Sequence, residues 1–419
     1  DLRFLRCVGG IGTGAVMLAL GGAFTGCARA PLPSAEQPLS DGRSNSRSAE
    51  EGPADASTRL DAASFTLDDA ARSLEAMAYP AALVQYSSLL RRTDLSATDR
   101  IRALRGVAET HEKLRDFAAA SRSWSRLAKV ADRVQDPSFT QYRREAWMRA
   151  GACQAELEAW EASAAMYLRA TDIGGGRLGQ QIEAEVRRAY AFYQMDALTT
   201  AEQLLNDAEP LLRRAQREER LPDYFFVGMA RFYQAAILHR RFREVAIRLP
   251  EARMAEDFEK KLGLLTETQA AYNETIRAKH VYWVSAAGLQ LGSLFEEFYD
   301  ALMYAPVPDW LNDSQRSEYY EALKLQLRPV VNKAIWVFEK NLDTATRLGY
   351  DNRFVEQTEE KLARLQGVLL SGDTAIGRPT TPLSDSAGDR AAIEPARPWG
   401  RSRAGAETRP RFLPVQTPL

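Results

Sequence analysis

Apolar side chains recur at intervals of three and four residues through most of the chain, between residues 59 and 371. The stretches AALVQYSSLL and FAAASRSWSRLAKV show this spacing clearly. It places the apolar residues on one face of an α-helix, whereas a half-buried strand alternates apolar and polar residues. Convincing alternation of that kind does not occur, so the pattern predicts an all-α protein.

The first half of this region contains one packing pattern four times. A large residue is followed after three positions by a small residue, and after four more by a second large residue. A small residue also lies nine positions before each set, at Ala70, Ala108, Gly151 and Ala189. The four sets, separated by 38, 43 and 38 residues, are Tyr79/Ala82/Tyr86, Phe117/Ala120/Trp124, Trp160/Ser163/Tyr167 and Leu198/Ala201/Leu205.

This pattern resembles the tetratricopeptide repeat (TPR), a helix–turn–helix unit of about 34 residues. The closest match is at Trp147, Gly151, Tyr167 and Ala170. The resemblance implies a solenoid of helical hairpins, because each hairpin leaves an apolar face that only a neighbour can cover. The longer separations depart from the TPR length and indicate longer helices or loops. An irregular helical bundle with chance periodicity is the alternative.

The second half is less regular and predicts longer helices. A long apolar run from residue 282 must end near Ala305–Pro308, because proline disfavours helix in the residue before it. The order AAGLQLG, FEEFYDAL, APVP and RPVVNKAIWVFEK resembles the distal part of TPR-type envelope proteins of gliding and predatory bacteria. We therefore expect TPR-like repeats at 59–215 and a longer-helix TPR-like region at 216–371.

The first residues follow a different pattern, typical of a secretory signal. Arg3 and Arg6 precede an uncharged, glycine-rich run that closes in small residues. Within it, FTGC resembles a lipobox, the bacterial signal-peptidase site before a lipid-modified cysteine. The resemblance implies a lipoprotein signal peptide at 1–26 and membrane attachment through acyl chains on Cys27, since several chains anchor stably. A plain signal peptide or an uncleaved anchor is the alternative.

Two segments beside the helical region have few large apolar residues and cannot bury enough surface to order themselves. We expect residues 27–58 to be a lipid-anchored flexible linker and residues 372–419 a disordered C-terminal tail. By resemblance to lipoproteins, Ala28 after the cysteine favours the outer membrane. The expected location is therefore the outer membrane, facing the periplasm.

Composition argues against several classes of function. The chain has 55 basic and 56 acidic residues and a formal net charge of −1, which gives no general attraction to nucleic acid. The three histidines lie far apart, so we expect no metal site and no cofactor. HExxH, GxSxG, P-loop and CxxC motifs do not occur, and Cys153 is expected to be a buried packing thiol.

By resemblance to TPR proteins, certain positions of each first helix should face a protein-binding groove. We expect a scaffold or adaptor, not an enzyme, that binds envelope proteins during assembly of a complex for secretion, motility or outer-membrane assembly. The alternative is that the residues at these positions are only solvated, or that they pack against the long helices of the second half. The alternative function is an α-helical envelope hydrolase or lyase acting on polysaccharide or peptidoglycan. The expected groove residues are Arg105, Glu109, Met148, Ala152, Tyr190 and Tyr193.

Overall fold

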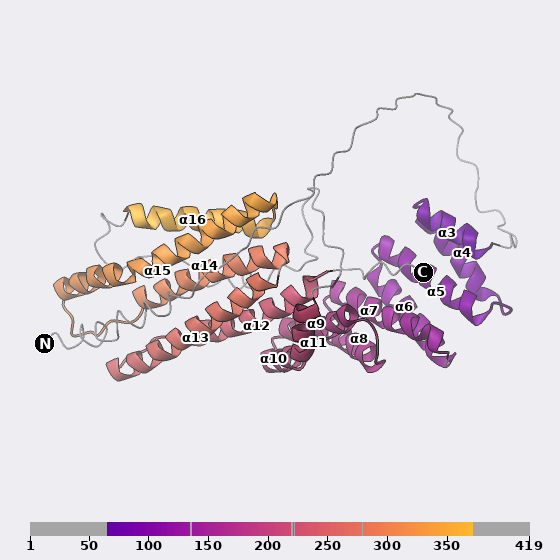
Figure 1. Cartoon of the computed structure of the whole chain (residues 1–419), viewed down its shortest axis with the longest axis horizontal. Coiled ribbons are helices and arrows are strands. Elements are labelled where there is room, and N and C mark those ends of the chain that lie inside the picture. The colour runs from indigo at the N-terminus through magenta and orange to yellow at the C-terminus, as the bar shows by residue number, and fades with distance from the viewer. Residues whose placement is uncertain (1–64, 135, 219–220, 222, 279, 372–419) are drawn as a thin grey trace, which may run out of the picture.

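The computed structural model describes residues 65–371, apart from 135, 219–220, 222 and 279. In this part of the chain every regular element is a helix, so the all-α prediction is confirmed. Successive helices pack against one another along an elongated molecule (Figure 1). The proposed signal peptide, Cys27, the linker up to residue 58 and the tail from residue 372 lie outside the described residues.

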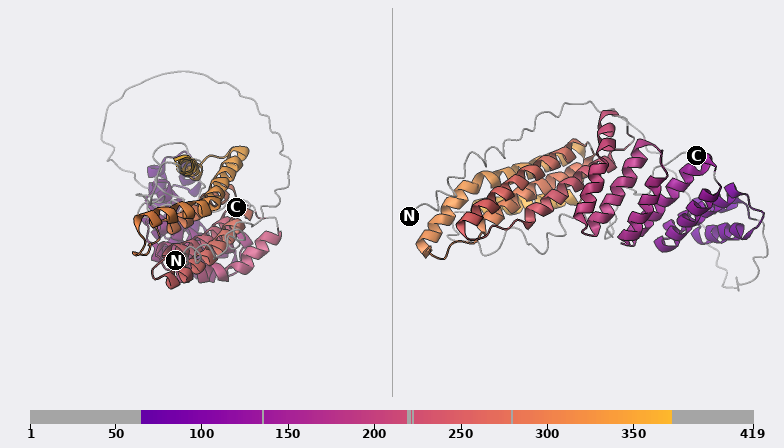
Figure 2. Two further views of the ribbon diagram at one scale, coloured as in Figure 1. Left: turned by 90° about the vertical axis from the view of Figure 1, so that its left-hand side faces the viewer. Right: turned by 90° about the horizontal axis from the view of Figure 1, so that it is seen from below.

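The first half consists of paired helices that lie side by side (Figure 2). The second helix of each pair begins at the first large residue of each predicted set. A short 3-10 helix, η1 (Pro137–Phe139), separates the second and third pairs, and α11 (Glu209–Glu218) follows the fourth. The pairs are α3 (Leu67–Glu75) with α4 (Tyr79–Arg91), α5 (Ala97–Lys113) with α6 (Phe117–Arg133), α7 (Thr140–Glu156) with α8 (Trp160–Asp172), and α9 (Leu178–Gln194) with α10 (Leu198–Asp207).

All four pairs turn in the same way. In the first turn Met77 is left-handed, with φ of 60°. Its N–H donates to Leu74 O at 3.0 Å, and Ala78 N–H donates to Ser73 O at 2.9 Å. These two bonds form a Schellman motif, which satisfies carbonyls at the end of a helix. The left-handed residues of the other three turns, each with the same two bonds, are Arg115, Glu158 and Asp196.

The small positions of the pattern are where helices approach closely. Ala82, Ala120 and Ala201 are fully buried. At Gly151 an added Cβ would lie 2.7 Å from the Tyr167 ring, so only glycine permits the contact between α7 and α8. The longer separation of 43 residues arises between hairpins, around η1, and leaves the turn within each hairpin unchanged.

The second half is built from five long helices that run along the length of the molecule (Figure 2). The central helix is α14, which packs against all four of the others and is buried along most of its length. It ends at Met303, just before Ala305–Pro308, as predicted. The five helices are α12 (Phe225–Glu244), α13 (Glu251–Arg277), α14 (Val281–Met303), α15 (Asp313–Leu348) and α16 (Arg353–Ser371).

The two halves share one apolar core. It extends from Ile182 on α9 to Leu365 on α16 and therefore passes across residue 216 without a break. Helix α12 makes the junction, because it contacts α9 and α10 as well as α13 and α14. The fourth hairpin is consequently packed on both sides, a fact that decides the environment of the predicted tyrosines.

Candidate functional site

The structure separates the six predicted groove residues into an accessible pair and a buried group. The side chains of Arg105 and Glu109 on α5 remain 20% and 27% exposed. Met148 and Ala152 are buried on α7, which neighbouring helices enclose on nearly all sides. These two residues pack between helices and do not line an open groove.

Tyr190 and Tyr193 are buried by the junction helix. Their ring centroids lie 5.0 Å and 4.8 Å from the ring of Tyr233 on α12. The Arg240 guanidinium, also from α12, lies 5.5 Å from the Tyr193 ring centroid. These contacts correspond to the alternative in which the residues pack against the long second-half helices. A groove floor made of these tyrosines is therefore absent from this arrangement.

Arg105 and Glu109 belong to a group of charged residues that joins two hairpins. Arg105 Nε donates to Glu109 Oε1 at 3.0 Å, and Arg105 Nη2 donates to Glu145 Oε1 on α7 at 3.1 Å. Arg149 Nη1 lies 3.9 Å from an oxygen of both Glu109 and Glu145. We call Arg105, Glu109, Glu112, Glu145 and Arg149 the α5–α7 charge network.

Glu112 is the buried centre of this network, with its side chain only 2% exposed. Trp124 Nε1 on α6 donates to Glu112 Oε1 at 2.7 Å, and Arg149 Nε on α7 donates to the same atom at 3.2 Å. Arg149 Nη2 also donates to Glu112 Oε2, and the guanidinium lies 4.8 Å from the Trp124 ring centroid. One carboxylate thus holds α5, α6 and α7 together.

Burial and mutual charge shift the titration of the network. Burial raises the pKa of Glu145, against the opposing charges of Arg105 and Arg149. For Arg149, burial alone would lower the pKa, but hydrogen bonding to Glu112 and its charge outweigh burial and raise it. Because only Arg105 and Glu109 are appreciably open to solvent, the network can exchange ion pairs with a partner only at that edge.

Cys153 adjoins the network without adding reactivity. It is buried, as predicted, and its Sγ donates to Glu112 Oε1 at 3.5 Å. Burial raises the pKa of this thiol, and the nearby Glu112 carboxylate raises it further. The nucleophilic form of cysteine is the thiolate, so this side chain is an inert packing group at neutral pH.

A second polar cluster, which the sequence pattern did not predict, lies buried among α12, α13 and α14. His239 Nε2 lies 3.2 Å from Glu297 Oε2, and His239 Nδ1 lies 3.1 Å from the Tyr272 hydroxyl. Arg243 Nε donates to Glu297 Oε2 at 2.6 Å. Lys261 Nζ donates to carbonyls at the end of α12, at 2.8 Å and 2.9 Å. The sequence feature that marks this cluster is a pair of adjacent glutamates, Glu296 and Glu297, inside a long apolar run.

The charges of this cluster are fixed by its surroundings. Burial alone would raise the pKa of Glu297, but His239 and Arg243 outweigh burial and hold it well below its usual range. Burial lowers the pKa of His239 despite the Glu297 carboxylate. The neutral imidazole therefore donates from Nε2 to Glu297 and accepts from the Tyr272 hydroxyl. Burial lowers the pKa of Lys261 to about 8.

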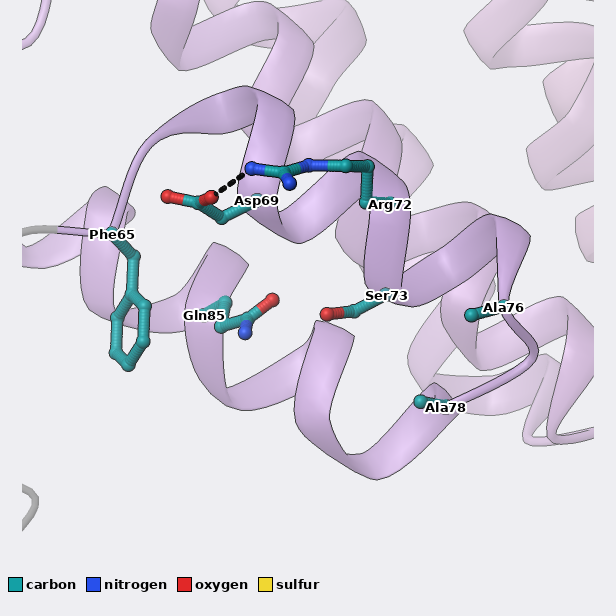
Figure 3. Close-up of a pocket in the computed structure, with 7 residues that line it drawn as sticks. All are labelled: Phe65, Asp69, Arg72, Ser73, Ala76, Ala78 and Gln85. Atoms are coloured by element: carbon teal, nitrogen blue, oxygen red, sulfur yellow. Dashed lines mark hydrogen bonds and ion pairs between the residues drawn. The ribbon is translucent and has the colours of Figure 1, made fainter.

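An open hollow lies at the first described hairpin, between α3 and α4 (Figure 3). Its volume is about 710 Å³. Asp69 and Arg72 form an ion pair at its edge, while Phe65, Ser73 and Gln85 also line it. It contains a single carboxylate, so the paired acids expected of a hydrolase are not found in this hollow.

Three broader observations complete the description of possible sites. Within the described residues, no group of three or more His, Cys, Asp or Glu side chains is placed to hold a metal ion. Of the helices that the structure describes, none has both the length and the apolar character to cross a bilayer. No protein-family model matches the chain, and no curated protein is significantly similar to it.

Proposed function

We propose that this protein is a TPR-type scaffold, anchored by lipid at Cys27 on the periplasmic face of the outer membrane, that binds protein partners during assembly of an envelope complex. The observation that carries the proposal is that the four hairpin turns have the same geometry. Their left-handed residues, Met77, Arg115, Glu158 and Asp196, recur at the same separations as the packing pattern of the sequence. Repeated hairpins stacked in one direction are typical of solenoids, which serve as extended binding surfaces.

The chemistry of the described residues supports binding more than catalysis. The α5–α7 charge network is saturated by its own ion pairs, and the second polar cluster is enclosed by helices. The stack nevertheless presents accessible apolar side chains at repeated positions. Leu114 and Leu157 cap α5 and α7 and are 43% and 45% exposed. Exposed leucines of this kind are suitable probes of a partner surface.

The membrane anchor is tested by Cys27→Ser. Under the proposal this variant is neither lipidated nor cleaved, because the thiol is the group that accepts the lipid. Metabolic labelling with a palmitate analogue, followed by mobility on a gel, measures both steps. Cys153→Ser is the matched control and retains full labelling. Equal labelling of the Cys27→Ser protein would contradict the anchor.

The scaffold is tested by photo-crosslinking in native membranes. A photoreactive amino acid replaces Leu114 or Leu157 on the stack, and Leu325 on α15, which is 70% exposed, is the control in the other half. Affinity purification and mass spectrometry identify the captured proteins. The expected result is one recurrent set of envelope proteins captured from the two stack positions. Capture at the level of an unrelated lipoprotein, or capture from Leu325 alone, would overturn the proposal.

A further inference from the structure

The residue directly before each left-handed turn residue is apolar in all four hairpins. It is Ala76, Leu114, Leu157 and Met195 in the four successive turns. Leu114 and Leu157 are 43% and 45% exposed. The first turn forms the same two hydrogen bonds with alanine at this position, so the turn itself does not require a large side chain there. Two leucines are therefore open to solvent at equivalent places without being needed for the hairpin turn.

Charges of opposite sign accompany the two leucines. Arg115 follows Leu114, Glu158 follows Leu157, and both charged residues are exposed. Because the hairpins lie side by side and stack in one direction, equivalent turns lie along one edge of the stack (Figure 2). We call Leu114, Arg115, Leu157 and Glu158 the turn edge. It offers two apolar side chains, with a positive charge beside one and a negative charge beside the other.

The fourth turn, by contrast, is bridged by a helix of this chain. Met195 occupies the leucine position and is half-buried. Arg240 Nη1, near the end of α12, donates to Asp196 Oδ1 at 2.6 Å, and Arg241 pairs with Glu202 on α10. Helix α12 has 20 residues, whereas α5, α7 and α9 have 17 each. A helix thus brings basic side chains to an acidic turn residue that lies beside an apolar one.

We infer that the turn edge binds an amphipathic helix of a partner protein, with a basic residue opposite Glu158 and an acidic residue opposite Arg115. This helix would pair with the second and third turns as α12 pairs with the fourth. Neighbouring helices pack about 8–10 Å apart, so the two leucines, which two such spacings separate, lie at most about 20 Å apart. A helix of four turns is about 22 Å long and can therefore present apolar residues to both.

A protein helix suits the turn edge better than a lipid surface does. Glu156 and Glu161 flank Leu157 and Glu158 in the sequence, and carboxylates at this turn repel anionic headgroups. Leucine beside charges of both signs is instead complementary to one face of an amphipathic helix. The inference rests on the scaffold function proposed above and names the kind of partner, and it does not depend on the lipid anchor.

Three synthetic helical peptides test the charge pattern by fluorescence anisotropy with the purified full chain. All have the same leucine face, but one has a basic and an acidic end, one has two basic ends and one has two acidic ends. The mixed peptide should bind about three-fold more tightly than the other two, as expected for an exposed ion pair. This comparison holds for either direction of the bound helix.

Charge reversal in the protein should change the order of the affinities. Arg115→Glu should make the peptide with two basic ends bind most tightly, and Glu158→Arg should favour the peptide with two acidic ends. Arginine and glutamate both already occupy the left-handed position in this chain, so both changes are compatible with the turn. An order that stays the same after both reversals would overturn the inference, as would the failure of all three peptides to bind.

The apolar contribution is tested by the double variant Leu114→Asp, Leu157→Asp. It should bind all three peptides at least about ten-fold more weakly, with circular dichroism unchanged. Leu325→Asp, at the 70% exposed leucine of α15, is the matched control and should bind as the unmodified chain does.

Two further outcomes separate this inference from the scaffold proposal. Envelope proteins that co-purify from native membranes in full yield with the double variant would overturn the inference and leave the scaffold proposal standing. Self-association of the unmodified chain that the double variant loses, measured by sedimentation velocity, would assign the turn edge to a second copy of the chain and would also overturn the inference.

Discussion

Glu296 and Glu297 are consecutive residues of α14, yet different helices bind their carboxylates. Lys361 Nζ donates to Glu296 Oε2 at 2.8 Å, and Arg364 also pairs with this carboxylate from α16. Glu297 is held from α12 by Arg243 and His239. The two adjacent side chains therefore fasten the central helix to neighbours that do not follow one another in the sequence.

Replacing Glu297 by glutamine should destabilise the second half by about 3 kcal/mol. The reason is that Arg243, whose side chain is only 24% exposed, loses the buried Glu297 charge, and removing one member of such a pair costs more than the pair itself contributes. Glu296→Gln should cost a similar amount, because Lys361 is only 15% exposed, although Arg364 is 38% exposed and can be solvated. Urea denaturation followed by circular dichroism measures both. Glu321→Gln, in an exposed pair with Lys324, is the control and should change stability by less than about 1 kcal/mol. A smaller loss for Glu297→Gln than for this control would contradict the argument.

Stability should fall as the pH decreases below 6.5, in part because of His239. Burial places its folded-state pKa below the usual value of 6.5. Between those two pKa values the unfolded chain binds a proton that the folded protein does not, so lower pH favours unfolding. The slope from one such group approaches about 1.4 kcal/mol per pH unit.

His239→Gln should flatten the dependence of stability on pH. The measurement is the free energy of unfolding between about pH 7.5 and pH 5, in steps of about one pH unit. The groups around the imidazole are Tyr272, Glu297, Arg243 and Lys261. Glu297 stays ionised through this range because its pKa is held low. His111→Gln, at an imidazole that is 18% exposed, is the control and should flatten the curve less. Identical curves for the His239→Gln and unmodified proteins would exclude the assignment.

Glu112 should matter more to stability than its neighbour Glu109. Glu112→Gln leaves Arg149 without its closest partner and should cost about 3 kcal/mol. Glu109→Gln removes a partly exposed carboxylate and should cost less than about 1 kcal/mol. Thermal denaturation of the two variants provides the comparison, because the two substituted residues lie about one helical turn apart on α5. Equal losses of stability would show that the buried Glu112 contributes no more than the partly exposed Glu109.

Glycine should stabilise the hairpin turns. Glu158 has φ of 60°, a conformation that non-glycine residues adopt at a cost. Glu158→Gly should raise the free energy of unfolding by about 0.5–1 kcal/mol, after the greater freedom of glycine in the unfolded chain is deducted. The reverse change, Gly349→Ala, places a Cβ where φ is 59° at the end of α15 and should lower stability. Destabilisation by Glu158→Gly would mean that its side chain compensates for the strain.

Local sequence was sufficient to place the hairpins but not their surroundings. The starts of α4, α6, α8 and α10 follow from large and small residues within one repeat, because these residues contact each other across a single turn. The burial of Tyr190 and Tyr193 depends on α12, which begins more than 30 residues after them. A repeat pattern predicts which face of each first helix points inward. It does not predict which later helix covers that face.

The candidate site shows the same division. Arg105 and Glu109 pair within α5, four residues apart, as the helical spacing allows. Their contacts with Glu145 and Arg149 join residues about 40 apart and required the hairpins to be stacked in space. The cluster at His239 depends on contacts 33 and 58 residues apart, so the adjacent glutamates 296 and 297 could mark its place on α14 but could not identify its partners.

The separation of the apolar core into clusters has a mechanical consequence. The first hairpin belongs to a small cluster shared only with α5, whereas α9–α16 share one large cluster that Glu296 and Glu297 reinforce. A solenoid loses its repeats one after another when each contacts only its neighbours. Tension applied to the N-terminal side of the chain would therefore peel α3 and α4 away first and release length in steps. The bundle around α14 would resist as one unit and break last.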